Sequence, residues 1–162
     1  MFERFEPGSR AVVARAREEA SALSSTKVEA EHLLLSLSRE KGTGAGSVLA
    51  EAGLDHDGLV RALDAELARS LEAVGVSAST VALAERPLPT TGEPRWGASA
   101  KKALAEALSA VKARGERSIR PAHILLGILH AREGTVPRAL DEAGVDPATL
   151  AARVEDTLGR KA

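Results

Sequence analysis

Two histidines occupy matching places in the sequence, and they are the first residues to consider for chemistry. His32 stands in Glu-His-Leu-Leu-Leu and His123 in Ala-His-Ile-Leu-Leu. A metal site or a general base needs partner groups, and neither histidine has a cysteine, a second histidine or a paired carboxylate at ligand spacing. We therefore expect each to be partly buried and hydrogen-bonded to a neighbouring helix end or loop. His56 and His130 are predicted to be surface residues.

The rest of the chain shows no catalytic arrangement either. No stretch matches the phosphate-binding loop G-x-x-x-x-G-K-[ST], and the glycine-rich segment 42–46 lacks both a preceding strand and a following Lys-Ser or Lys-Thr. No nucleophile stands beside a base in a recognisable pattern. We predict a protein that is not an enzyme, requires no cofactor or metal, and neither binds nor hydrolyses ATP.

The composition of the chain disfavours some classes of binding partner. Charged residues make up 28% of the 162 residues, but they nearly cancel to a net charge of −1, which disfavours a nucleic-acid surface built from clustered Lys and Arg. No apolar run approaches the ~20 residues needed to cross a bilayer, and the N-terminus has no hydrophobic signal region. There is no cysteine. We expect a cytoplasmic protein that acts on neither membranes nor nucleic acids.

The sequence contains one unit twice. His32 and His123 are separated by 91 positions, and so are Gly53 and Gly144, which end two similar Ala-Gly stretches. The same offset relates flanking positions upstream and downstream, so the copies align here without a gap. An internal repeat of this kind indicates a fold made of two equivalent halves.

Within each copy, apolar residues recur at helical spacing. Asp55 and Asp146 are suitable N-caps, and Gly53 and Gly144 are suitable C-terminal stops. A segment at 74–81 favours β structure, and the Pro- and Gly-containing stretch after it reads as an irregular connector. Eight helices are predicted, at 7–23, 29–39, about 46–52, from the Asp55 cap through Leu67, 99–113, 120–131, 136–143, and from the Asp146 cap to about 158.

These elements predict an all-α fold of two tandem four-helix repeats related by a pseudo-twofold axis. Four short helices bury little surface alone, so we expect the two repeats to share one core, with the second and sixth helices at its centre. The predicted boundaries place one domain over 1–162, with repeat 1 at about 2–72, a linker at about 73–94 and repeat 2 at about 95–160.

The motifs of both copies resemble the Clp N-terminal repeat domain, most of all the amino-terminal domain of ClpC-type AAA+ unfoldases. The resemblance covers nearly the whole chain. It is carried by Met1-Phe2-Glu3-Arg4-Phe5, Arg17-Glu18-Glu19-Ala20, Glu31-His32-Leu33-Leu34-Leu35, Lys101-Lys102-Ala103-Leu104 and His123-Ile124-Leu125-Leu126-Gly127. In that family the domain caps an ATPase ring and recruits adaptors and substrates for threading into a protease.

The resemblance therefore implies a non-enzymatic module of the Clp protease system that binds adaptors or substrate peptides. A different function is also open, because the sequence departs from the family at functional positions. A stand-alone copy of the domain would act as an immunity-type protein, sequestering macrocyclic peptide antibiotics that target ClpC. We expect the chain to be such a stand-alone copy.

One family site looks degraded. In relatives that bind phosphoarginine, a Glu on each central helix pairs with the guanidinium group, and a nearby Thr and Arg help to hold the phosphate. Here Glu31 is kept, but its counterpart in repeat 2 is Ala122. The Thr positions hold Glu6 and Gly97, and the Arg positions hold Gly8 and Ser99. We expect weak phosphoarginine binding, with Glu31 as the residual site residue, although a carboxylate stabilising a helix N-terminus is the simpler interpretation.

A second family surface is better preserved. In ClpC-type domains, an N-terminal Phe, an aromatic residue beside the fifth helix and nearby cations form a surface that macrocyclic antibiotics occupy. Phe2, Arg10, Trp96 and Lys101 match these positions, whereas Arg17 stands where a Gln is usual. Aromatic anchors beside cations suit a peptide-binding patch. We predict that these five residues bind an apolar or cyclic peptide; the alternative is that they only pack.

Overall fold

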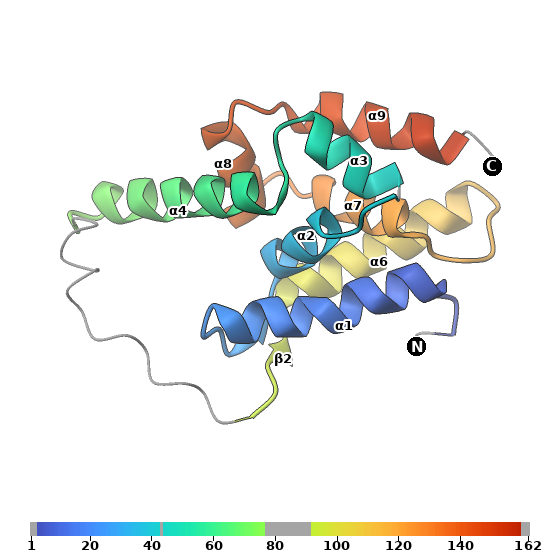
Figure 1. The fold of residues 1–162 in the computed structure, drawn as a ribbon, viewed down its shortest axis with the longest axis horizontal. Coiled ribbons are helices and arrows are strands. Elements are labelled where there is room, and N and C mark those ends of the chain that lie inside the picture. The colour runs from blue at the N-terminus through green and yellow to red at the C-terminus, as the bar shows by residue number, and fades with distance from the viewer. Residues whose placement is uncertain (1–2, 43, 77–91, 160–162) are drawn as a thin grey trace.

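The computed structural model describes residues 3–42, 44–76 and 92–159. This part of the chain forms eight helices in two sets of four, and the predicted all-α fold is confirmed (Figure 1). The first set comprises α1 (Pro7–Ala22), α2 (Ala30–Ser38), α3 (Gly44–Glu51) and α4 (His56–Ala73), and the second α6 (Ala98–Ala113), α7 (Pro121–Leu129), α8 (Thr135–Glu142) and α9 (Pro147–Gly159).

Several helix ends form as their local chemistry predicts. The Asp55 carboxylate accepts a hydrogen bond from the Gly58 backbone N–H at 2.8 Å and caps α4. Asp146 caps α9 in the same way. Gly53 and Gly144 follow α3 and α8 with φ angles of 77° and 70°, a left-handed conformation that favours glycine.

Some segments differ from the sequence prediction or lie outside the described residues. Gly44, predicted to lie in a turn, is instead the first residue of α3. The segment predicted to favour β structure lies mostly outside the described residues, and its first residue, Val74, is in a turn after α4. Most of the predicted linker is likewise outside the described residues, so the boundaries of the repeats remain a prediction.

Two short strands were not predicted, and they show how the repeats join. β1 (Lys27–Val28) pairs in parallel with β2 (Arg95–Trp96), and an isolated parallel bridge joins Phe5 to Ile119. Residues 5 and 96 are counterparts at the offset of 91, and so are residues 28 and 119. The segment before the first helix of each repeat therefore pairs with the segment before the second helix of the other.

The backbone hydrogen bonds repeat this exchange. The Gly97 N–H donates to the Val28 carbonyl at 2.9 Å, and the Glu6 N–H donates to the Ile119 carbonyl at 3.1 Å. These are the same bond at counterpart positions. The reciprocal pairing is what a pseudo-twofold relation between the repeats requires.

The core is centred on α2 and α7, as predicted. In Figure 1 these two helices lie between α1 and α6 on one side and α3 and α9 on the other. α1 packs mainly on α2, α6 on α7, and α4 on α8. The two central helices supply many of the fully buried side chains: Leu33, Leu34, Leu35 and Leu37 from α2, and Ile124, Leu125 and Ile128 from α7.

Candidate functional site

His32 and His123 act as helix caps. The His32 Nδ1 accepts a hydrogen bond from the Glu29 N–H at 2.8 Å, and the His123 Nδ1 accepts one from the Arg120 N–H at 3.0 Å. Both histidines are three residues after the N-cap, where a side chain can reach back to the N-cap amide. The predicted structural role at a helix end is confirmed, but both side chains are buried rather than partly buried, and each bonds the start of its own helix.

His123 is completely buried, and its Nε2 lies 3.4 Å from a carboxylate oxygen of Glu116. Burial lowers the pKa of both His32 and His123, so their rings are neutral at neutral pH. Across the described residues, no group of three or more His, Cys, Asp or Glu is arranged to hold a metal ion. The two rings thus contribute to helix ends, with no geometry for metal chemistry.

His56 is not the free surface residue that the sequence predicts. Its side chain is 25% exposed, and its Nε2 lies 3.1 Å from Glu19, which also accepts a hydrogen bond from the Arg39 guanidinium. Burial alone raises the pKa of Glu19, but these hydrogen bonds outweigh burial and hold its pKa below the ordinary value. His130, in contrast, is exposed as predicted.

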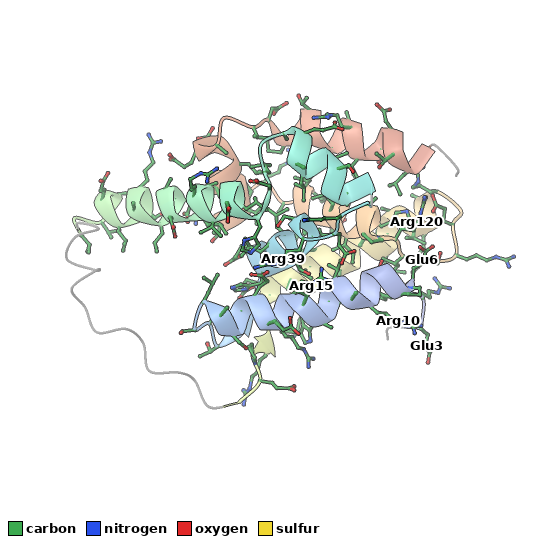
Figure 2. All side chains as sticks on the ribbon, viewed as in Figure 1. Glu3, Glu6, Arg10, Arg15, Arg39 and Arg120 are labelled. Carbon is green, nitrogen blue, oxygen red and sulfur yellow. The ribbon has the colours of Figure 1, made fainter. Side chains whose placement is uncertain are left out.

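Further polar contacts join α1 to α2. The Ser36 hydroxyl donates to the Val12 carbonyl at 2.7 Å, and the Arg15 guanidinium bonds Glu40 at 2.7 Å. Figure 2 shows Arg15 and Arg39 drawn beside α2. In repeat 1, the first two helices are therefore joined by partly buried hydrogen bonds and ion pairs.

In repeat 2, the corresponding helices α6 and α7 are joined without these side chains. The counterpart of Ser36 is Gly127, and a Cβ atom built there would lie 2.1 Å from the Ala103 carbonyl oxygen. The counterparts of Glu19 and Arg39 are Ala110 and His130. α6 and α7 are consequently held by close backbone packing, which only glycine at position 127 permits.

A cleft of about 660 Å³ opens beside the start of α2 and α6. Its polar side chains are Glu29, Glu31, Ser99, Lys102, Glu106, His130, Arg132, Glu133 and Thr135. Burial raises the pKa of Glu31, and the negative charges of Glu29 and Glu66 raise it further. The corresponding cleft of repeat 2, which contains Arg120 and Ala122, measures only about 170 Å³.

Carboxylates of this chain lie at or beside the positions that the family resemblance implies for phosphate binding. Glu29 accepts hydrogen bonds from both the backbone N–H and the hydroxyl of Ser99. A Cβ atom at position 97 would overlap the Glu29 carboxylate, so a Thr there requires the Glu29 side chain to move. In the second cleft, Glu6 accepts a hydrogen bond from Ser118 at 2.7 Å. Weak phosphoarginine binding stays a prediction, and this geometry favours it.

Of the five residues predicted to bind peptides, two are in direct contact. The Arg17 guanidinium carbon lies 5.5 Å from the centroid of the Trp96 ring, a cation–π geometry. Glu93 bonds the same guanidinium at 3.1 Å. Trp96 is partly exposed, whereas its counterpart Phe5 is buried. The pair therefore presents an aromatic surface with an ordered cation above it.

Two of the remaining three are less constrained. Arg10 and Lys101 are exposed, and their side chains make no hydrogen bond or ion pair with any other residue of the described part of the chain. Phe2 lies outside the described residues. The sequence did not reveal Glu93 as a partner of Arg17. Aligning the repeats shows only that position 17 differs in character from its counterpart, because Leu108 stands where repeat 1 has Arg17.

The chain matches the family model described as the Clp repeat N-terminal domain over residues 4–86 and 96–162. It is 32% identical over 160 residues to the chloroplastic chaperone protein ClpC1 of Arabidopsis thaliana, and 28% identical over 145 residues to the negative regulator of genetic competence ClpC/MecB of Bacillus subtilis. These matches cover 98% and 90% of this chain. The chain spans about one sixth of each relative's length, since the covered shares are 15% and 16%.

Solved structures share the fold. The N-terminal domain of the caseinolytic protease associated chaperone ClpD from Arabidopsis thaliana is similar, with a TM-score of 0.73 and 22% identity, over 99% of this chain and 97% of that one. The Hsp104 N-terminal domain from Candida albicans has a TM-score of 0.67 and 16% identity, over 98% and 94% of the two chains. None of the helices described here is long and apolar enough to cross a membrane.

Proposed function

We propose that this chain, which belongs to the Clp repeat N-terminal domain family, binds apolar peptide segments of Clp adaptors or substrates through the surface around Arg17 and Trp96. The observation that carries this proposal is the Arg17 guanidinium held over a partly exposed Trp96 ring. The proposed activity is binding without catalysis.

The contact supports peptide binding because it combines two kinds of recognition. The Trp96 ring offers apolar area, and burying such a side chain against a ligand contributes ~1.5–3 kcal/mol. The Arg17 guanidinium offers donors for peptide carbonyl groups, and Glu93 keeps it oriented. Arg10 and Lys101 have exposed, unpaired side chains within the described structure, so a peptide gains their donors without first breaking a described ion pair.

A second candidate function uses the same surface. A macrocyclic peptide antibiotic presents apolar side chains and carbonyl groups in a fixed conformation, so it loses less conformational entropy on binding than a linear peptide does. The partly exposed Trp96 under a cation suits such a ligand as well. On this proposal the chain sequesters the antibiotic and lowers its free concentration.

Trp96 is the only tryptophan, so its fluorescence reports this surface directly. A ClpC-binding cyclic peptide and a linear apolar peptide are titrated separately. We expect saturable changes in emission. Arg17→Ala should weaken binding by about two- to tenfold, as expected for loss of a hydrogen bond to a peptide carbonyl worth ~0.5–1.5 kcal/mol. Tight binding of the cyclic peptide alone favours sequestration, and binding of the linear peptide favours recruitment.

The matched control is Arg61→Ala, which removes an exposed arginine on α4. It should bind like the wild type. Calorimetry with Trp96→Ala provides a second measurement that does not depend on fluorescence, and an affinity loss of more than about tenfold is expected. Unchanged affinity in both Arg17→Ala and Trp96→Ala would show that these residues only pack.

A further inference from the structure

A groove of about 410 Å³ lies between α6 and α9, over α7. Its apolar surface includes Leu126 and Ala151, both only partly buried. Glu106, His130 and Glu155 are the charged or titratable side chains along it. Its volume is within the range of ligand-binding pockets.

Repeat 1 has different residues at the positions that correspond to this groove. The counterpart of Ala110 is Glu19, which is only 7% exposed and is bonded by the Arg39 guanidinium and by His56. On the second helix of each repeat, Leu35 is 1% exposed, whereas its counterpart Leu126 is only partly buried. Repeat 1 therefore has a buried, ion-paired carboxylate and a buried leucine at positions where repeat 2 has an alanine and a partly exposed leucine.

From this difference between the repeats we propose that the groove of repeat 2 docks an arginine-bearing apolar segment of a partner protein. The guanidinium would lie beside the Glu106 carboxylate, next to His130, which is the counterpart of Arg39. Its methylene stem would cover Leu126, as long cationic side chains cover apolar surface elsewhere. An apolar neighbour of the arginine would rest on Ala110 and Ala151.

The charges along the groove suit a cation. The Nε2 of His130 lies 3.8 Å from a carboxylate oxygen of Glu106, and the His130 side chain is 68% exposed. Glu155 is bonded by Arg114 at 2.6 Å through one oxygen and is half exposed. A guanidinium at Glu106 therefore displaces no described hydrogen bond, while an incoming carboxylate would be repelled by the negative charge of Glu106.

This groove is separate from the surface around Arg17 and Trp96, and none of its lining residues belongs to that surface. The proposal therefore does not depend on the proposed function. If the Trp96 titrations show no binding, the groove proposal still stands. If the groove proposal fails, the result of the Trp96 titrations still stands.

The test is an NMR titration of the full chain with acetyl-Leu-Arg-Leu-amide, compared with acetyl-Leu-Gln-Leu-amide. We expect saturable shifts of the amide signals of Ala110, Leu126 and Ala151. The arginine peptide should bind at least about threefold more tightly, the factor expected for a surface charge pair. Equal affinity for the two peptides, or shifts located elsewhere, would overturn the proposal.

Two variants sharpen the test. The double variant Ala110→Glu with His130→Arg installs the pair found in repeat 1, fills the groove, and should abolish the saturable shifts. Glu106→Gln should weaken the arginine peptide by about threefold and leave the glutamine peptide unchanged. The control is Glu133→Gln, an exposed carboxylate outside the groove, which should bind like the wild type. If Glu106→Gln, which adds no bulk to the packed helices, binds both peptides as the wild type does, the proposal is wrong.

Discussion

Repeat 1 and repeat 2 differ most where the first two helices of each repeat meet. α1 is joined to α2 by a buried hydroxyl–carbonyl bond from Ser36 to Val12 and by the ion pairs around Glu19. α6 meets α7 through Gly127, whose Cα lies against the backbone of Ala103. The helices are nevertheless arranged in the same order with the same capping histidines.

The comparison teaches that the repeat tolerates two means of holding one helix pair. A polar junction needs several side chains that satisfy one another, since each buried polar group must keep a partner. A glycine junction needs only one small residue, but it allows no other residue at that position. The counterpart leucines also differ in exposure, since Leu35 is 1% exposed whereas Leu126 is only partly buried.

The largest effect is expected when the residue of repeat 1 is placed into repeat 2. Gly127→Ser puts a Cβ atom 2.1 Å from the Ala103 carbonyl oxygen, a backbone atom that moves only if the helices separate. We expect a loss of about 3 kcal/mol in the free energy of unfolding, measured by urea denaturation. The reverse change, Ser36→Gly, removes one hydrogen bond and should cost only about 1–2 kcal/mol. Equal losses in the two variants would contradict the difference in packing.

An intermediate effect is expected for the ion pairs of repeat 1. Glu19→Gln removes the charge that Arg39 and His56 share at a buried position, and should lower the free energy of unfolding by about 1–2 kcal/mol. The control is Glu142→Gln, which breaks a pair with the 73% exposed Arg69 and should change stability by less than about 0.5 kcal/mol. Both values come from urea denaturation at neutral pH. A Glu19 variant as stable as the control would mean that these contacts add nothing.

The smallest effect concerns pH. Burial lowers the pKa of His123 below its ordinary value of 6.5, so the unfolded chain takes up a proton at higher pH than the folded chain does. Stability should therefore decline as pH falls from 7 towards 5, before the carboxyl of Glu19 begins to protonate. His123→Gln keeps a side chain able to reach the Arg120 amide but does not titrate, so its decline over this range should be shallower. Parallel curves for variant and wild type would exclude His123 as a source of the dependence.

Local patterns predicted most of the helices and their ends. Asp55 and Gly53 act on neighbouring residues, so their roles are visible in the sequence itself. The cross-paired strands were missed because each has only two residues and its partner is in the other repeat. Two-residue segments carry no alternation that could reveal a strand.

The candidate sites were predicted less completely, for the same physical reason. Glu19 brings together groups from three helices, and its sequence neighbours are an acidic residue and an alanine, which predict a solvated face. The contact between Arg17 and Trp96 likewise depends on the crossing of the two repeats. Gly127 could have been noticed, since aligning the repeats places it opposite Ser36. The alignment does not give the distance between the helices, and that distance determines how much the change from Ser36 to Gly127 affects their packing.

The exchange of segments between the repeats bears on how such a chain could arise. Phe5 bridges Ile119, and Val28 pairs with Trp96, so each half supplies one side of both junctions. A lone ancestral unit would have both segments without partners, and two identical units meeting about a true twofold axis would satisfy all four at once. A self-associating ancestor followed by gene fusion therefore needs no new contact at any step. After fusion the two copies were free to mutate separately, which a symmetric dimer encoded by one gene does not allow.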